Sequence, residues 1–271
     1  MICGKKPLYG KTFDILLAVP LAIYLLLIAG LTLAVFFAIT PASIRQAFAD
    51  NAIWDAVSLS MITTTLSTFL SVCVAIPAGY ILSRHRFYGH SLADTLVDLP
   101  IVLPPLVMGL CVLLFFNTKI GLWLDRGIVE EGLFVYQPLG IILVQFIVGC
   151  AFAVRVIKSG FDSMDPAYED MAMTLGANRW QTFYKVTLSS AAPSIMAGAV
   201  ISWARIFGLF GPILLVAGTM RGRTEIMPTT IFLEVSIGRI EVALVVAAMM
   251  ILISMAILIV LKRLGGRGYL L

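Results

Sequence analysis

Charged side chains are scarce in this chain. Asp, Glu, Lys and Arg make up 13% of its 271 residues, whereas 60% of the residues are hydrophobic. In an average soluble domain about a quarter of the residues are charged, so this composition excludes an ordinary soluble protein. The hydrophobic residues also form runs of the roughly 20 residues that a helix needs to cross a bilayer. We therefore predict an all-α polytopic membrane protein, folded as a single domain over residues 1–271.

Several motifs that carry chemistry are also missing. The sequence has no Gly-x-x-x-x-Gly-Lys-Ser/Thr loop for ATP phosphates and no His-Glu-x-x-His zinc motif. It contains two histidines, and its four cysteines lack the spacing of a metal or redox site. We expect no catalytic residue, no metal site and no bound cofactor in this chain. If ATP is used, a separate protein must bind it.

Six long runs with almost no charge predict six membrane spans. They cover about residues 15–40, 56–83, 99–118, 136–158, 190–217 and 242–262. Lys5, Lys6 and Lys11 precede a first run far longer than the roughly 7–15 apolar residues of a signal peptide, so we expect this span to remain. No Asp, Glu or His lies well inside a predicted span, whereas secondary transporters usually carry such groups there. The energy for any transport would then come from another protein.

The distribution of basic residues predicts the orientation. With a cytoplasmic N-terminus, 12 Lys and Arg residues fall on the inner side and 6 on the outer side, and Arg205 lies in the fifth span. Because short cytoplasmic loops carry the excess of Lys and Arg, both termini are predicted to be cytoplasmic. The polar segment 165–193, between the fourth and fifth spans, then also lies inside.

This polar segment predicts a pair of short helices. Asp165 suits an N-cap, Pro166 suits the first helical position, and Gly176 can adopt the left-handed conformation that ends the first helix. Asn178 can cap a second helix. The first helix would carry one apolar stripe at positions i, i+3, i+4 and i+7, formed by Tyr168, Met171, Ala172 and Leu175. So short a pair cannot bury its own apolar faces, so we expect a partner to cover them.

Prolines and glycines interrupt two of the predicted spans. The segment 98–105 contains three prolines, among them Pro104 and Pro105, which either mark a helix start or form a kinked element lining a pathway. In the fifth span, Arg205 is predicted to lie near the middle of the bilayer, followed by Gly208 and Gly211, where the helix can break. These five residues are candidates for a translocation pathway, although Arg205 could instead be a structural residue paired with backbone carbonyls.

Two polar loops and one span have simpler interpretations. The basic and aromatic loop 84–90 is predicted to be a membrane-surface turn, and its two histidines do not suggest a metal site. The loop 220–228 is predicted to be a solvated loop on the outer side. The second span is rich in Ser and Thr, which favours a helix packed against other helices over one that faces lipid.

The polar segment resembles a known family. Tyr168-Glu-Asp-Met-Ala-Met-Thr-Leu-Gly-Ala177 and the residues up to 188 are similar to the coupling loop of binding-protein-dependent ABC importer permeases. The segments 99–105, 204–211 and 224–232 extend the likeness to the molybdate, tungstate and sulfate branch. Three positions depart from the pattern: Asp170 replaces Glu, Ser189 replaces Pro, and Leu209 stands where this branch has Glu four residues after the Arg.

The resemblance implies a type I importer fold with cytoplasmic coupling helices over 166–188. It implies two permease copies in the cytoplasmic (inner) membrane, a cytoplasmic ATPase dimer that binds ATP, and an external substrate-binding protein that delivers an oxyanion. The implied ATPase-docking residues are Tyr168, Glu169, Asp170, Met171, Ala172, Leu175, Gly176 and Ala177.

Other functions stay open at this point. The permease could carry a metal ion, a phosphonate or a small organic solute, and a channel or secondary carrier is a further alternative. A DNA-binding helix-turn-helix at 167–188 is disfavoured because its second helix offers only Arg179 and Lys185 to neutralise phosphates. We therefore expect lipid contacts and no nucleic-acid partner. A membrane enzyme is disfavoured by the missing catalytic motifs.

Overall fold

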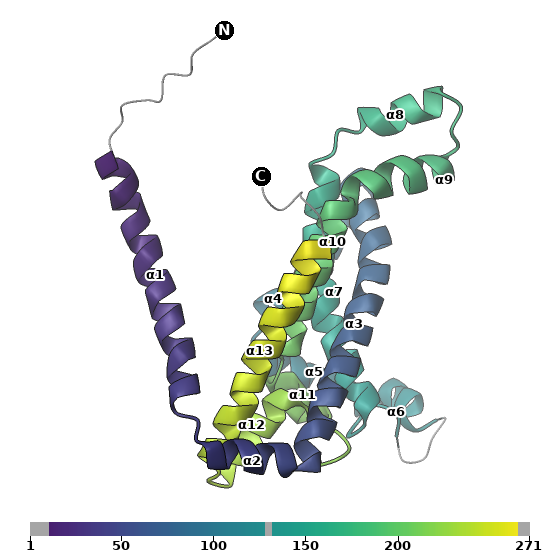
Figure 1. Ribbon diagram of the computed structural model, residues 1–271. Coiled ribbons are helices and arrows are strands. Elements are labelled where there is room, and N and C mark those ends of the chain that lie inside the picture. The colour runs from purple at the N-terminus through teal and green to yellow at the C-terminus, as the bar shows by residue number, and fades with distance from the viewer. Residues whose placement is uncertain (1–10, 128–131, 265–271) are drawn as a thin grey trace.

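The computed structural model describes residues 11–127 and 132–264, and every regular element in these ranges is a helix. The elements are α1 (Lys11–Phe37), α2 (Pro41–Ala49), α3 (Asn51–Arg84), α4 (His90–Val102), α5 (Pro105–Phe116), α6 (Lys119–Arg126), α7 (Pro138–Asp162), α8 (Ala167–Thr174), α9 (Arg179–Thr182), the π-helical turn η1 (Phe183–Thr187), α10 (Leu188–Phe207), α11 (Gly211–Val216), α12 (Met227–Ser236) and α13 (Ile240–Leu264). The long helices run alongside one another, with α8 and α9 protruding at one end and α2, α6 and α12 at the other (Figure 1).

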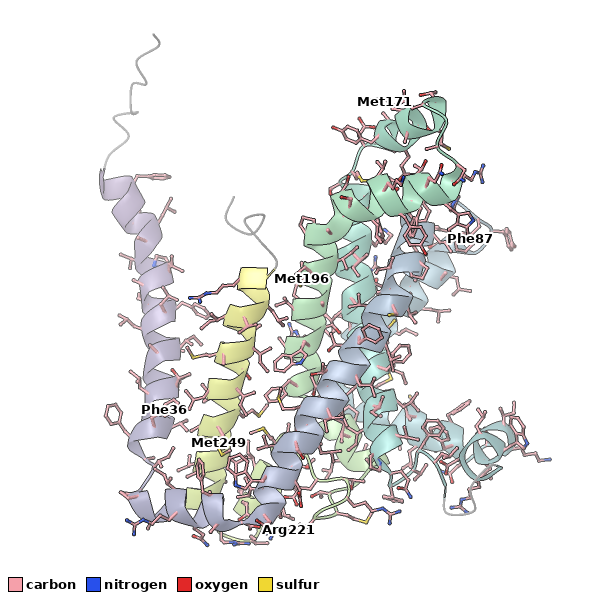
Figure 2. The ribbon with its side chains drawn as sticks, turned by 45° about the vertical axis from the view of Figure 1, so that its right-hand side comes forward. Phe36, Phe87, Met171, Met196, Arg221 and Met249 are labelled. Atoms are coloured by element: carbon pink, nitrogen blue, oxygen red, sulfur yellow. The ribbon has the colours of Figure 1, made fainter. Side chains whose placement is uncertain are left out.

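The described residues contain five single helices that are long and apolar enough to cross a membrane. These are α1, α3, α7, α13 and the helix that runs without interruption from α9 to the end of α10. The pair α4 and α5 meets the same test and makes a sixth span if the two are counted together. Counted in this way, the helices agree with the six predicted spans. α1 stands apart from the bundle (Figures 1 and 2), contacts α13, and has no buried residue in its candidate span.

The third span is broken rather than straight, because α4 and α5 are bent by 114° relative to each other. Leu103 and Pro104 have extended backbone with ψ of 137° and 136°. A residue before proline is pushed out of the helical region, and Pro105 can start the next helix because its missing N–H needs no partner there. The helix α4 begins at His90, before the predicted start of the span at residue 99, and holds Pro100 in its interior. The last two prolines therefore mark a bend.

The fifth span also differs from its predicted limits. Its helix begins at Arg179, before the predicted residue 190, and ends at Phe207, and α11 starts only at Gly211. The predicted break near Gly208 is confirmed. Arg205 lies in the last turn of α10, directly before this break, as the sequence indicated. The helix begins earlier than the predicted span because the polar helix that starts at Arg179 continues directly into the apolar span.

Hydroxyl groups and small residues hold α3, α7 and α10 close together. The Ser67 hydroxyl on α3 donates a hydrogen bond to the backbone carbonyl of Ile142 on α7 at 3.1 Å. The Ser202 hydroxyl on α10 donates to the carbonyl of Gly149 at 3.0 Å, and a Cβ at Gly149 would lie 2.7 Å from that hydroxyl. Only glycine therefore allows this approach. The Ser/Thr-rich second span is confirmed as a packing helix.

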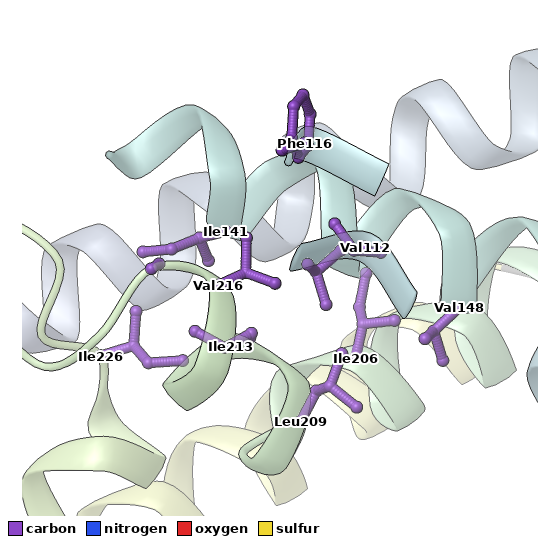
Figure 3. Packing of buried hydrophobic residues seen from close by; sticks show 11 residues of the cluster. Val112, Phe116, Ile141, Val148, Ile206, Leu209, Ile213, Val216 and Ile226 are labelled. Carbon is purple, nitrogen blue, oxygen red and sulfur yellow. The ribbon is translucent and has the colours of Figure 1, made fainter. Parts of the chain in front are cut away.

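The largest apolar cluster joins α5, α7, α10 and α11 (Figure 3). Val112 and Phe116 of α5 pack there with Ile141 of α7 and Ile213 of α11. Leu209, which follows Arg205 by four positions, is also a member and is buried. Its side chain therefore contributes to the core between the two broken spans.

The second half of the loop before α12 is buried, so the interpretation of 220–228 as a solvated loop holds only for residues 220–223, which are exposed. Thr224 and Glu225 of the loop are buried, as are Thr229, Thr230 and Glu234 of α12. These residues lie at the end of the bundle marked by Arg221 in Figure 2.

Two arginines offset the buried acidic groups. Arg221 contacts Glu234 and approaches Glu225 at 4.0 Å and Asp50 at 3.9 Å, while Arg239 contacts Glu234 at 3.1 Å. Sequence reasoning missed this cluster because it joins the start of α3 to α12. Each of these three carboxylates thus has a guanidinium group within 4.0 Å.

The burial of Glu225 predicts a pH-dependent stability. Glu225 lies outside the candidate spans and is 2% exposed. Burial raises the pKa of its carboxyl group, and this effect outweighs the hydrogen bond with Thr230 and the charge of Arg221, which lower that pKa. The folded protein therefore keeps this proton to a higher pH than the unfolded chain. Its stabilising contribution is complete below the ordinary glutamate pKa and is lost as the pH rises through the raised value.

We expect Glu225→Gln, which mimics the protonated side chain, to raise the thermal unfolding midpoint above neutral pH and to leave it almost unchanged under acidic conditions. Thermal unfolding of the purified protein across a pH series measures both effects. Glu241→Gln removes an exposed carboxylate at the same end and serves as the control. An equal gain from both variants would assign the effect to net charge and contradict the role of burial.

Candidate functional site

The α8–α9 hairpin is defined by the caps that the sequence indicates. The Asp165 carboxylate accepts a hydrogen bond from the Ala167 amide at 2.9 Å, so it caps α8, although the helix begins at Ala167 and not at Pro166. Gly176 has a φ of +92°, and the left-handed turn is confirmed. Asn178 and Gln181 form a reciprocal capping box at 2.8 and 2.9 Å. These local interactions set the angle between the two helices.

The predicted apolar stripe on α8 is largely uncovered. Tyr168 is 56% exposed, Met171 57% and Leu175 89%, while Ala172 is half-buried. Met171 lies near the tip of the protruding hairpin in Figure 2. An apolar row this exposed, beyond the ends of the spans, is typical of a surface that another protein covers.

Three further members of the predicted docking set lie beside this stripe. Asp170 and Gly176 are exposed, and Ala177 is half-buried. Asp170, the residue that departs from the family's Glu, therefore faces away from the bundle.

Glu169 differs from the other predicted docking residues because it points toward the bundle and is buried. Its carboxylate contacts the Arg84 guanidinium at 3.1 Å and accepts a hydrogen bond from the Tyr80 hydroxyl at 3.1 Å. Arg84 also donates to the backbone carbonyl of Met164 at 3.0 Å. Both partners of Glu169 belong to α3, so this residue ties the hairpin to α3 and does not form part of the exposed stripe.

The second helix of the hairpin is attached to α3 and continuous with α10. The Phe183 ring of η1 packs edge-on against the Tyr80 ring of α3, with 5.0 Å between the ring centroids. The helix then continues through η1 into α10 without a break. A displacement of the hairpin would therefore reach both α3 and α10.

The two broken spans pack against each other. A Cβ at Gly211 would lie 3.1 Å from the Leu106 side chain, and one at Gly109 would lie 2.6 Å from the Pro212 backbone. The predicted pathway residues Gly208, Pro104 and Pro105 lie at these breaks and are exposed. The sequence indicated each break but not their contact.

Arg205 is exposed, and its guanidinium lies over the Phe152 ring of α7, 5.1 Å from the ring centroid. Among the described residues, no carboxylate lies within ion-pairing distance of Arg205. Its side chain is thus held by an aromatic face, which leaves its hydrogen-bond donors available. The carbonyl pairing considered from the sequence has no counterpart in the described residues.

A second charged cluster at the α8 end was missed by sequence reasoning. Arg155 of α7 contacts Asp98 and Asp94 of α4, the latter at 3.1 Å, and Lys158 contacts Asp162 at 3.1 Å. The sequence did contain a sign of this cluster. Residues four positions apart share one face of a helix, and Asp94 and Asp98 have that spacing.

The fold and this site define a class. The chain is a membrane-embedded transport subunit with a protruding helical hairpin, two broken spans at its centre and, in the residues described, no group of three or more metal-ligating side chains. Residues 71–267 match the family of binding-protein-dependent transport system inner membrane components, and the chain belongs to this family.

Individual relatives extend the comparison. The chain is 33% identical over 228 residues to a molybdate/tungstate transport system permease protein, WtpB, of Pyrococcus furiosus, with 83% of this chain and 84% of the relative covered. It is 30% identical over 214 residues to the sulfate transport system permease protein CysT of Escherichia coli, with 78% and 76% covered. A crystal structure of a bacterial ABC transporter that imports alginate has a TM-score of 0.76 at 18% identity, with 94% of this chain and 96% of that chain covered, which shows the same fold.

Proposed function

We propose that this protein is the membrane-spanning subunit of an ATP-driven importer for an oxyanion such as molybdate, tungstate or sulfate. An external binding protein would deliver the anion, and a separate cytoplasmic ATPase dimer would hydrolyse ATP. The observation that carries the proposal is the exposed stripe of Tyr168, Met171 and Leu175 on a hairpin fixed to α3 and α10. In this arrangement two copies of the chain line the path, and both termini are cytoplasmic.

The proposed coupling is mechanical. The ATPase would bind the stripe and move α8 as it closes on ATP. The buried contacts of Glu169 with Arg84 and Tyr80 would carry this motion to α3, while the continuous helix would carry it to α10. Because α10 ends at the break beside Arg205, this motion would shift the packed breaks of the two central spans.

The proposed substrate class rests on two observations. Relatives that match most of the chain are named as molybdate/tungstate and sulfate permeases. Arg205 offers a planar set of N–H donors with no neighbouring carboxylate, which suits an anion whose oxygens accept hydrogen bonds. A permease for another small solute is the alternative, and it would leave Arg205 without a role in uptake.

Reconstitution tests the proposal. The chain would be placed in proteoliposomes with the ATPase and the binding protein with which it co-purifies, and uptake of labelled molybdate and sulfate would be followed with and without ATP. We expect uptake only when ATP and both partners are present. Uptake that persists without the ATPase would indicate a channel or secondary carrier. ATP-dependent uptake of an uncharged solute, with no uptake of molybdate or sulfate, would contradict the oxyanion assignment.

We expect Arg205→Ala to lower the maximal rate of oxyanion uptake by roughly tenfold or more, since charged hydrogen bonds typically contribute about 1.5–3 kcal/mol. Folding should be retained because the side chain is exposed. Arg205→Lys keeps the charge but not the planar donor set and should have an intermediate effect. Arg45→Ala, an exposed arginine on α2, is the control. Unchanged uptake kinetics in Arg205→Ala would show that this residue only packs on Phe152 and has no role in uptake.

A further inference from the structure

A cavity of about 630 Å³ lies between α3 and the hairpin, at the α8 end of the bundle. Its apolar walls include Pro77 and Ile81 of α3, Phe183 of η1 and Trp180 of α9. The cavity is separate from the proposed translocation path, because neither Arg205 nor the broken spans line it. It is also separate from the docking stripe, because α8 contributes Glu169 and Met173 to it and not Tyr168, Met171 or Leu175.

The polar lining of this cavity has a positive excess. Arg84 is paired with Glu169, so these two charges offset each other. Arg179 lines the same cavity, is exposed, and has no carboxylate within ion-pairing distance among the described residues. One wall of the cavity therefore presents uncompensated positive charge beside a mostly apolar surface.

The position of the cavity fits the boundary between hydrocarbon and water. The outer face of α3 is apolar and exposed up to Ile81, as at Leu70 and Val74, and the basic loop begins immediately afterwards. In that loop Phe87 is 42% exposed and Tyr88 is fully exposed, and Figure 2 shows Phe87 projecting near the hairpin. Exposed aromatic and basic residues at the end of a span are typical of the headgroup region.

We propose that this cavity binds an anionic phospholipid of the leaflet on the α8 side, with its phosphate at Arg179 and an acyl chain along Pro77 and Ile81. Basic pockets between helices on the cytoplasmic side recognise anionic headgroups through the same combination of charge and apolar wall. A soluble phosphate could use Arg179 but would gain nothing from the apolar wall. The bound lipid would lie between α3 and α9 and so stabilise one orientation of the hairpin. This proposal requires only that α3 crosses the bilayer, and it is independent of the transported solute.

Trp180 provides a direct probe, since it lines the cavity and is one of four tryptophans in the chain. The full chain would be reconstituted in phosphatidylcholine nanodiscs with increasing amounts of brominated phosphatidylglycerol or brominated phosphatidylcholine. The Trp180 contribution to the fluorescence is the difference between the wild type and Trp180→Phe. We expect brominated phosphatidylglycerol to quench this contribution at an about fivefold lower mole fraction than brominated phosphatidylcholine does. This factor is the one expected for the attraction between one basic residue and an anionic lipid.

Two variants test the charge. In Arg179→Gln, phosphatidylglycerol should quench Trp180 no better than phosphatidylcholine. In Arg126→Gln, on α6 at the opposite end, the preference for phosphatidylglycerol should be retained. Arg179→Lys should retain most of it. Equal quenching by both lipids in the wild type would overturn the proposal. Loss of quenching on addition of millimolar inorganic phosphate would assign the site to a soluble anion, and loss on addition of the partner ATPase would assign it to the docking interface, and either result would also overturn it.

Discussion

Replacing Leu175 with Asp is expected to abolish the substrate-stimulated ATP hydrolysis of the assembled transporter while the permease stays folded. Leu175 is 89% exposed at the end of the α8 stripe, so its side chain contributes little to the packing of this chain. A charge placed in an apolar interface must lose its water without gaining a partner. Loss of one residue that contributes strongly to an interface costs about 2 kcal/mol or more, which corresponds to a roughly 30-fold weaker complex.

Co-purification of the ATPase, followed by its hydrolysis rate with substrate-loaded binding protein, measures this effect. Ile120→Asp is the matched control, because Ile120 is an apolar residue of α6 that is 68% exposed at the opposite end of the bundle. Leu175 is a better test than Ala172, since Ala172 is half-buried and a charge there would also disturb the hairpin. Full stimulation of ATP hydrolysis in Leu175→Asp would show that the stripe is not the docking surface.

Replacing Glu169 with Ala is expected both to destabilise the hairpin and to uncouple ATP hydrolysis from uptake. The Arg84 and Glu169 side chains are 11% and 12% exposed, so removal of one leaves the other charge buried without its partner. Breaking a buried ion pair in this way typically costs about 3–5 kcal/mol. Because the stripe itself stays intact, the ATPase should still bind, but its motion would no longer reach α3.

The uptake achieved per ATP hydrolysed is the informative measurement, together with amide exchange over α8. Glu169→Gln keeps a hydrogen-bond acceptor for Tyr80 and should have a smaller effect. The double variant Arg84→Met and Glu169→Met removes both charges and should recover much of the lost stability. An unchanged ratio of uptake to hydrolysis in Glu169→Ala would contradict the role of this contact in coupling.

Much of the fold could be predicted because its causes are local along the chain. Apolar runs determine where helices cross the membrane, since the transfer free energy depends on composition within about 20 residues. Gly176, Asp165 and Asn178 determine the hairpin through backbone angles and caps within one turn. The prolines after Leu103 likewise determine a bend, because they restrict the preceding residue directly.

The tertiary structure decided which of these residues face one another. Arg84 and Glu169 are 85 positions apart, so only the packing of α8 against α3 shows that Glu169 is an anchor and that Asp170 lies outside. The burial of Glu225 and the contact between the two broken spans arise in the same way, from helices distant in sequence. The sequence by itself thus determined the spans, breaks and caps, because these depend on local conformation and transfer to the membrane. Packing alone decided the direction of each side chain, because the charge and shape of a distant partner determine which face of a helix is buried.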